Sequence, residues 1–501
     1  MNVKQHSSMQ SVTTSPWPRY VVDVAGWDRL ASDLAAGTYT LLGLWGEHAQ
    51  VHMAIFDPAT TELAIATLPV PDGRFPSVAH RHLPALRMER TIADLFGFEV
   101  VGCPDPRPWL DHGKWPVKHP LAAHPTAGQA HAPYKFLPVE GEGIHQIPVG
   151  PIHAGIIEPG HFRFSANGET VVRLEELLGY MHRGVEKMFE DADLAKAAKL
   201  AGRISGDSTV AYAFAFARAV EAALGIEAPP RAQWLRAMMA EMERIANHFG
   251  DVGAVCNDAA FSLLHAHCNI LREELAQLAL SGFGHRFMMD CIVPGGVAVD
   301  PDETFRKKLR DWIDHAEKQF DAIVKVYDET ASLKNRTDTT GFVREDLARQ
   351  YGAGGFVGRA SGRSFDTRRH VPYAPYDALD FEVIVLTTGD VNARVWVRVC
   401  EIRQSFALLR QILERLPNGK IMTPLPANVQ EEREGMALVE GFRGDVLVWL
   451  RMEGGKIKRC YPRDPSWFQW PLLENCIKGN IVADFPLCNK SFNCSYSGHD
   501  G

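Results

Sequence analysis

The chain has 501 residues, of which 46% are hydrophobic and 23% are charged. These fractions are typical of globular proteins and exclude a disordered, collagen-like or coiled-coil protein. Lys and Arg total 53 and Asp and Glu total 61, which gives a formal net charge of -8. The acidic balance argues against a nucleic-acid-binding protein, because such proteins usually carry a basic excess. At about 100–200 residues per domain, the length predicts two to four domains.

The sequence pattern predicts neither a targeting signal nor a membrane-spanning segment. The longest candidate apolar run, at 210–217, ends at Arg218 and falls short of the ~20 residues that span a bilayer. The first residues contain no apolar core, so we expect no signal peptide. The nine cysteines are scattered and include no Cys-x-x-Cys pair, so we expect no disulfide framework. These features predict a cytoplasmic protein that can still be attached to a membrane protein.

The first part of the chain shows short apolar runs separated by turn signals. We expect strands of an antiparallel sheet at 41–45, 51–56 and 62–68, followed by a helix over 87–98. Residues 1–19 are interpreted as a flexible arm and residues 20–115 as a small α+β domain. Residues 116–145 are rich in Pro, His, Ala and Gly and bury little apolar surface, so they are predicted to form a linker.

From residue 146 onward, helical periodicity dominates. Two hairpins are expected, with strands at 161–164 and 170–174 and, near the end, at 445–452 and 456–461. Six helices are expected, at 175–189, 208–224, 231–250, 271–283, 302–329 and 394–416. We therefore predict an α+β fold, in which a large, mainly helical domain over 146–501 carries small peripheral sheets.

Several short motifs follow one another in a fixed order along this large domain. They are Gly150-Pro151-Ile152-His153, Glu158-Pro159-Gly160-His161-Phe162, Gly179-Tyr180-Met181-His182-Arg183-Gly184-Val185-Glu186-Lys187, Glu243-Arg244-Ile245-Ala246-Asn247-His248, Pro294-Gly295-Gly296-Val297, Arg359-Ala360-Ser361-Gly362 and Gly479-Asn480-Ile481-Val482-Ala483-Asp484. Together they resemble the superfamily of the nickel-iron hydrogenase large subunit, in its membrane-bound group 4 form, and the 49-kDa subunit of respiratory complex I. The resemblance implies the fold of that superfamily.

The first domain carries a second resemblance. Arg90, Asp94 and the segment Gly102-Cys103-Pro104-Asp105-Pro106-Arg107 resemble the 30-kDa subunit of complex I. The two resemblances together imply a fusion of two subunits, as in hydrogenases of the formate hydrogenlyase type.

The metal ligands of the hydrogenases are replaced in this chain. The resemblance implies four thiolates from two Cys-x-x-Cys pairs, which is the soft ligation that nickel and iron take there. Ser205 and Ser208 stand at the first pair of positions, and Ser495 and Gly498 stand at the second. A serine hydroxyl stays protonated near neutral pH and is a poor ligand. We therefore expect no metal site here. The nearby Cys488 and Cys494 are interpreted as small buried hydrophobes, although the sequence leaves open whether either binds a metal.

The resemblance to complex I also implies a quinone site. In that family a histidine at a hairpin tip and a tyrosine near the first ligand pair contact the quinone headgroup. His153 matches the histidine, whereas the tyrosine position falls on Gly206. Asp207 or Tyr212 could compensate for the lost tyrosine. His153, Gly206 and Tyr212 thus form the expected quinone pocket.

Four side chains are candidates for catalysis in this cleft: His153, Glu186, Arg203 and Asp207. Histidine titrates near neutral pH and is a natural proton donor. Glu186 is expected to share one face of a helix with His182, four residues earlier. Arg203 is expected beside the former metal position, where a buried guanidinium needs a partner such as Asp207. The alternative is that these residues only pack or form ion pairs.

The chain lacks both the metal ligands and the quinone tyrosine. In this it resembles the hydrogenase-4 component G-like subunits of energy-converting hydrogenase-related complexes, which lack the nickel ligands. This resemblance implies a peripheral electron-transfer subunit of a membrane-bound, ion-translocating oxidoreductase complex, on the cytoplasmic side of the inner membrane. A quinone is the candidate acceptor, and hydrogenase activity is not expected. One implied partner is an iron-sulfur subunit like the complex I 20-kDa subunit, which would carry the cluster. The other implied partners are antiporter-like membrane subunits and a membrane protein like the H subunit of complex I. The alternatives are a non-catalytic scaffold and a hydrogenase with unusual ligands.

Overall fold

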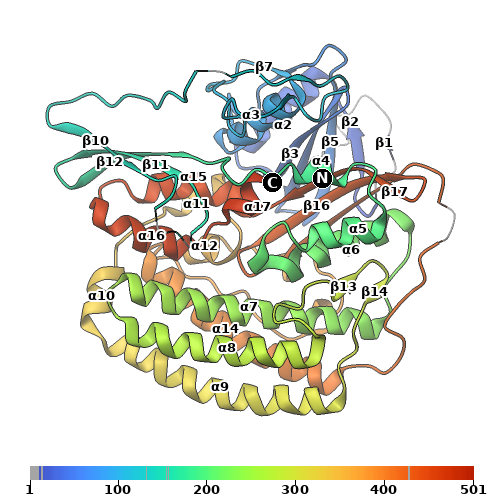
Figure 1. Cartoon of the computed structure of the whole chain (residues 1–501), viewed down its shortest axis with the longest axis vertical. Coiled ribbons are helices and arrows are strands. Elements are labelled where there is room, and N and C mark those ends of the chain that lie inside the picture. Colours follow the sequence, from blue (N-terminus) through green and yellow to red (C-terminus); the bar gives the residue numbers. More distant parts are fainter. Residues whose placement is uncertain (1–10, 13–14, 131, 154, 156, 427–428) are drawn as a thin grey trace.

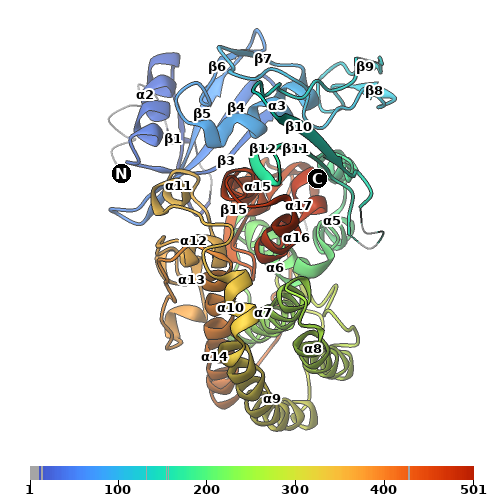
Figure 2. The ribbon, with the colours of Figure 1, turned by 90° about the vertical axis from the view of Figure 1, so that its left-hand side faces the viewer.

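The computed structural model describes residues 11–12, 15–130, 132–153, 155, 157–426 and 429–501. In Figure 1 and Figure 2 the N-terminal sheet lies at one end of the molecule and long helices lie at the other. The C-terminal strands and short helices lie between them. The α+β architecture predicted from the sequence is confirmed.

A five-stranded sheet forms the N-terminal region, in the strand order β1-β2-β5-β4-β3. Its strands are β1 (Ser11–Val12), β2 (Arg19–Val21), β3 (Thr40–Glu47), β4 (Gln50–Asp57) and β5 (Glu62–Pro69). β3, β4 and β5 pair antiparallel, as predicted, and β2 runs parallel to β5. The helices α2 (Val24–Ala35) and α3 (Leu86–Phe96) contact this region. The strand predictions and the helix at 87–98 are confirmed, whereas α2 was not expected.

Parts of the predicted arm and linker contact the rest of the chain. Arg19 forms an ion pair with Glu434, with 2.9 Å between nitrogen and oxygen. Within the predicted linker, β8 (Val117–Lys118) pairs with β9 (Thr126–Ala127). Residues 1–10, 13–14 and 131 lie outside the described residues. The domain boundaries stay predictions.

One predicted helix, at 175–189, is wrong. A three-stranded sheet is formed by β10 (Ile144–Val149), β11 (His161–Asn167) and β12 (Thr170–Leu177), and only α4 (Val185–Phe189) is helical in that stretch. Gly179 and Gly184 have φ values of +96° and +68°, a backbone region that breaks a right-handed helix. The loop that they create carries His182, so His182 and Glu186 do not share a helix face.

Long helices form the far end of the molecule (Figure 1). They are α6 (Thr209–Leu224), α7 (Pro230–Asp258), α8 (Ser262–Phe283), α9 (Glu303–Glu329) and α14 (Val391–Arg415). Each contains one of the stretches with helical periodicity to within one residue, so these five helix predictions are confirmed. α7 and α8 pack against each other along their lengths, and the groove between them becomes part of the site described below.

The C-terminal strands form a sheet between the N-terminal sheet and α6. β15 (Arg433–Glu440), β16 (Asp445–Glu453) and β17 (Lys456–Arg463) pair antiparallel, and the predicted hairpin is confirmed. Trp449 and Tyr461 pack against Trp45 of β3 with ring centroids 5.4 and 4.7 Å apart, so one face of this sheet covers the N-terminal sheet. α6 contacts β15 and β16.

Three short helices follow the last strand and bring the C-terminal residues into the centre of the molecule (Figure 2). They are α15 (Ser466–Cys476), α16 (Phe485–Phe492) and α17 (Tyr496–Asp500). The remaining elements are α5 (Leu194–Ala201), α10 (Ala331–Thr337), α11 (Glu345–Gln350), α12 (Gly355–Ala360), α13 (Thr367–His370), β6 (Arg74–Pro76), β7 (Glu99–Val101), β13 (Ile292–Val293) and β14 (Gly296–Val297). No helix among the described residues has both the length and the apolar character needed to cross a bilayer.

Candidate functional site

Two segments that are distant in the sequence meet at the positions of the hydrogenase ligands. The hydroxyl of Ser205 lies 2.8 Å from the hydroxyl of Ser495, although 290 residues separate them. Ser495 caps the N-terminus of α17, and its hydroxyl accepts a hydrogen bond from the amide of Gly498 at 2.8 Å. The left-handed backbone of Asn493, with φ +45°, ends α16 and turns the chain toward Ser495. Hydroxyl groups thus bond to one another at the positions where the resemblance implies thiolates.

Asp207 ties this serine cluster together. Its carboxylate accepts hydrogen bonds from Ser205 at 2.8 Å and from Ser208 at 3.1 Å. Arg443, which follows β15, donates to the same carboxylate at 2.5 Å and to the hydroxyl of Ser208 at 3.1 Å. Burial alone would raise the pKa of Asp207, but Arg443 and the two serine hydroxyls outweigh burial and lower it. Asp207 is therefore held as a carboxylate.

Arg203 does not take the place expected from the sequence. Its guanidinium pairs with Asp290 at 2.6 and 2.7 Å, and its side chain is 44% exposed. The expected pairing with Asp207 is wrong, because Arg443 occupies that carboxylate. The partner of Asp207 comes from a strand connection 236 residues away, so local spacing could not identify it.

Tyr212 and Gly498 both contact Asp464. Tyr212 is fully buried in α6 and donates its hydroxyl proton to Asp464 at 2.7 Å. Burial and the neighbouring carboxylate raise the pKa of this tyrosine well above its usual value. A Cβ atom at Gly498 would lie 2.5 Å from the same Asp464 carboxylate and 2.9 Å from the Ser495 hydroxyl. Asp464 and Ser495 therefore fill the space that a side chain at position 498, the fourth implied ligand position, would need.

We expect Gly498→Ala to destabilise this cluster by about 1–3 kcal/mol, which is typical of an overpacked core position. Hydrogen–deuterium exchange of the purified complex would show faster exchange in the peptides that contain Ser205 and Ser495. Gly206→Ala is the matched control on the facing segment, because a Cβ there meets nothing within 4 Å. Equal exchange in the two variants would contradict the steric argument.

His153 lies beside the segment that contains Ser495. Its Nδ1 is 3.3 Å from the carbonyl oxygen of Pro151, and its ring centroid is 5.6 Å from that of Phe162 and 6.5 Å from that of Tyr496. Its Nε2 is buried and has no hydrogen-bond partner within the described part of the chain. His153 is thus close to Tyr496, the residue after Ser495. It lines neither of the two cavities described below.

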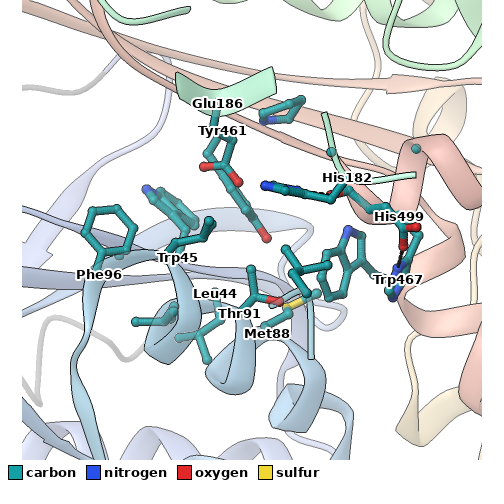
Figure 3. Close-up of a pocket in the computed structure, with 18 of the residues that line it drawn as sticks. Leu44, Trp45, Met88, Thr91, Phe96, His182, Glu186, Tyr461, Trp467 and His499 are labelled. Atoms are coloured by element: carbon teal, nitrogen blue, oxygen red, sulfur yellow. Dashed lines mark hydrogen bonds and ion pairs between the residues drawn. The ribbon is translucent and has the colours of Figure 1, made fainter. Parts of the chain in front are cut away.

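Glu186 lines a small cavity between the N-terminal region and the large domain (Figure 3). It forms an ion pair with Arg459 of β17. The cavity measures about 30 Å³, enough for a single water molecule. His182 and His499 also line it, and His182 approaches the carbonyl oxygen of Asp500 at 2.7 Å. His182 and Glu186 therefore face one cavity without sharing a helix.

A much larger cavity of about 670 Å³ begins at Gly206 and Asp207 and runs between α7 and α8. Apolar side chains from both helices and from the loop after α8 form most of its wall, and they are Met242, Ala246, Leu275, Ala276, Ala279, Phe287, Met288 and Met289. Its polar lining consists of Glu243, Asn247, Asn269, Arg272, Glu273 and Arg286, together with Asp207. Such a cavity, mostly apolar with a few polar groups, is typical of a small-molecule site.

The cavity contains residues that the sequence analysis did not select. Glu243 and Asn247 belong to one of the family motifs but were not predicted to line a binding site. Their i, i+4 spacing on α7 was a signal that they face the same way, but the spacing does not distinguish a cavity wall from a packed core. Gly206 and Asp207 are the two sequence-selected residues that reach this cavity.

The cysteines close to this region are not arranged as ligands. Cys488 and Cys494 are buried. The neighbouring Cys476 and burial raise the pKa of Cys488, and burial raises that of Cys494, in both cases well above the usual value, so both stay protonated thiols. Among the described residues, no group of three or more His, Cys, Asp and Glu side chains is placed to hold a metal ion.

Three family models match successive parts of the chain. Residues 13–129 match the respiratory-chain NADH dehydrogenase 30 Kd subunit, residues 183–250 match nickel-dependent hydrogenase, and residues 259–437 match the respiratory-chain NADH dehydrogenase 49 Kd subunit. The first match corresponds to the predicted resemblance to the 30-kDa subunit, and the other two correspond to the predicted resemblance to the hydrogenase and 49-kDa superfamily. Both resemblances are confirmed.

Individual relatives agree with these matches. The carbon monoxide-induced hydrogenase of Rhodospirillum rubrum is 31% identical over 70% of this chain and 97% of its own length. Hydrogenase-4 component G of Escherichia coli (strain K12) is 30% identical over 85% of this chain and 76% of its own. The fused C/D subunit of the NADH-quinone oxidoreductase of Bacteroides thetaiotaomicron is 26% identical over 96% of this chain and 93% of its own.

A solved structure shares the fold. A chain from the structure of the membrane-bound sulfane sulfur reductase, an archaeal respiratory membrane complex, is 26% identical with a TM-score of 0.68, and the match covers 73% of this chain and all of that one. From the family models, these relatives and the shared fold, it follows that this chain belongs to the superfamily of the nickel-iron hydrogenase large subunit and the complex I 49-kDa subunit, fused to a domain of the 30-kDa-subunit type.

Proposed function

We propose that this chain is the acceptor-reducing subunit of a membrane-bound, ion-translocating respiratory complex and that it works without a nickel-iron centre. The acceptor is a quinone, and it binds in the cavity between α7 and α8. The observation that carries this proposal is the cavity of about 670 Å³ that starts at Gly206 and Asp207, the segment in which the resemblance to complex I implies a quinone-binding tyrosine.

The size and lining of the cavity suit a quinone. Ligand cavities usually measure about 300–1,000 Å³ and combine apolar walls with a few oriented polar groups. Ala276 and Met289 contribute to the apolar wall for a flat ring, and Asp207, Glu243 and Asn247 supply polar groups at one end. A quinone needs apolar contact for its ring and hydrogen-bonding groups for its two oxygens.

The former ligand positions do not fit a nickel-iron pair. Ser205, Ser208 and Ser495 direct their hydroxyls to one another or to Asp207, and Gly498 has no side-chain atom that could bind a metal. Soft thiolate ligands would be required. No step of the proposed reaction therefore uses such a centre.

Electrons are proposed to come from an iron-sulfur cluster on a partner subunit that resembles the complex I 20-kDa subunit. Antiporter-like membrane subunits and a protein like the H subunit of complex I would then couple the reaction to ion translocation. In this arrangement the chain lies on the cytoplasmic side of the inner membrane. His153 and Glu186 were expected to donate a proton and to lie on a proton path, but neither lines the cavity between α7 and α8, so neither has a role in this proposal.

The proposal is tested by filling the cavity. Ala276 is 6% exposed and lines the cavity from α8, so Ala276→Phe is expected to lower the rate of quinone reduction by the purified complex at least tenfold. Gln277→Phe is the matched control, because it places the same side chain on the exposed face of α8. Equal rates in the wild type and Ala276→Phe would contradict a quinone site here. Absence of reduction by the wild-type complex would favour the non-catalytic scaffold.

A further inference from the structure

We infer that Glu243 is the acid that delivers protons to the acceptor bound in the cavity between α7 and α8, while Asp207 stays ionised. This inference rests on the proposed function and adds the proton donor. Glu243 lines the same cavity as Asp207 and Gly206, and it projects from α7 toward the first turn of α6, where it meets Val210 and Ala211.

The two carboxyl groups of the cavity have opposite environments. Asp207 accepts hydrogen bonds from Arg443, Ser205 and Ser208, and these lower its pKa. Glu243 is 6% exposed and has no salt-bridge partner among the described residues. Burial raises the pKa of Glu243 to about 8. Where the environments of two carboxyl groups keep one protonated and the other ionised, the protonated group usually donates the proton and the ionised group stays an anion.

Glu243 can exist in both protonation states without rearrangement. Its oxygens accept the amide hydrogens of Val210 at 2.7 Å and Ala211 at 3.1 Å. These amides belong to the N-terminus of α6, which favours a negative charge, so the carboxylate left after proton transfer is stabilised. Each oxygen keeps a second lone pair, so a proton can bind without breaking either hydrogen bond.

The charged groups around Glu243 leave its proton available. Arg244, the next residue on α7, directs its guanidinium to the carbonyl oxygens of Glu440 and Gly441. Asn247 holds the loop in place by donating to the carbonyl oxygens of Asp207 and Glu243 at 2.8 and 2.9 Å. The remaining charged residues of the cavity are Arg272, Glu273 and Arg286.

These last three residues connect the cavity with water. Glu273 and Arg286 pair with each other at 2.5 Å, and their side chains are 46% and 43% exposed. Reduction of a quinone to a quinol takes two electrons from the iron-sulfur partner and two protons. Glu243 gives one proton to a quinone oxygen, regains a proton from water at the exposed end of the cavity, gives the second proton to the other oxygen and is reprotonated from water again. Atoms and charge then balance.

The inference predicts a distinctive pH dependence. Because the proton of Glu243 is present below pH about 8 and lost above it, the rate of quinone reduction should fall as the pH rises through that value. Glu243→Gln should lower the rate about 100-fold and remove this alkaline decline. Glu243→Asp, which keeps an acid, should retain a decline even if the shorter side chain slows the reaction. A purely structural role would lower the rate and leave the decline in place.

Glu89→Gln is the matched control. Glu89 is also a buried glutamate that accepts two backbone amide hydrogens, from Val78 and Ala79, and burial raises its pKa to about 7. It lies on α3, outside the cavity. An infrared pH titration of the complex gives a second readout, because the wild type should lose a protonated carboxyl band near pH 8 that Glu243→Gln lacks and Glu89→Gln keeps.

Photolabelling of the same samples with a photoreactive quinone measures quinone binding. Together with the rates, it separates the possible results. Intact labelling with a slow, pH-independent rate in Glu243→Gln is the expected result. Intact labelling with an unchanged alkaline decline in Glu243→Gln would overturn the role of Glu243 and leave the proposed function standing. A wild-type complex that neither binds nor reduces quinone would overturn the proposed function, and the role of Glu243 with it.

Discussion

Arg359→Met is expected to destabilise the protein by about 3–5 kcal/mol or more, because it leaves buried carboxylates without their cation. Arg359 is 1% exposed and binds Glu401 at 2.6 Å and Glu440 at 2.8 Å. Glu401 also accepts a hydrogen bond from His248 at 2.8 Å. Burial would raise the pKa of Glu401, but Arg359 is the largest of the influences that lower it well below its usual value.

The loss of stability in Arg359→Met should depend on pH. Without Arg359, burial would raise the pKa of these carboxyl groups in the folded protein above the unfolded value. Stability then falls as the pH rises through the folded pKa, so the melting temperature of the complex should drop more at pH 8 than at about pH 5. Arg344→Met is the control, because Arg344 and its partner Asp346 are exposed and such pairs contribute little. A pH-independent loss would contradict this explanation.

Arg443→Met is expected to have the second-largest effect. Arg443 is 2% exposed, and it joins Asp207 to the segment before α17 by donating to the carbonyl oxygen of Asn493 at 2.5 Å. Its loss removes the cation of a pair whose carboxylate is 32% exposed, so we expect a cost of about 2–4 kcal/mol, below that of a fully buried pair. Burial would then raise the pKa of Asp207, so its carboxyl group would take up a proton more readily.

Hydrogen–deuterium exchange of the purified complex measures this effect locally. Exchange should increase in the peptides around Asp207 and Asn493 and remain unchanged in the N-terminal sheet. Arg403→Met removes an exposed ion pair with Asp321 and serves as the control, for which a change below about 1 kcal/mol is expected. Unchanged exchange around Asp207 would show that Arg443 does not hold the two former ligand segments together.

The sequence predicted the regular elements well where one periodicity continued without interruption. α6, α9 and α14 each follow a helical pattern, and β3 to β5 follow short apolar runs between turns. The prediction failed at 175–189, because β12 continues to Leu177 by pairing with β11 and two glycines with positive φ follow. Pairing of β12 with its neighbour β11 outweighed the helical spacing there.

The site could be predicted only in part. The motif resemblance indicated that Ser205 and Ser495 belong to one site, and they lie 2.8 Å apart. The partners of Arg203 and Asp207 could not be predicted, because Asp290 and Arg443 come from distant loops that only the tertiary fold brings near. The cavity escaped the sequence analysis for a similar reason. An apolar wall and an apolar core have the same helical spacing.

The central claim is that a quinone binds beside Gly206 and Asp207, and photolabelling tests it most directly. The purified complex would be treated with a photoreactive quinone, and the labelled peptides would be mapped by mass spectrometry. Labelling of residues such as Met242 and Met289, which line the cavity, with loss of the label when free quinone competes, is the predicted result. An intact complex with no specific label in this chain, or with label confined to residues outside the cavity, would contradict the claim.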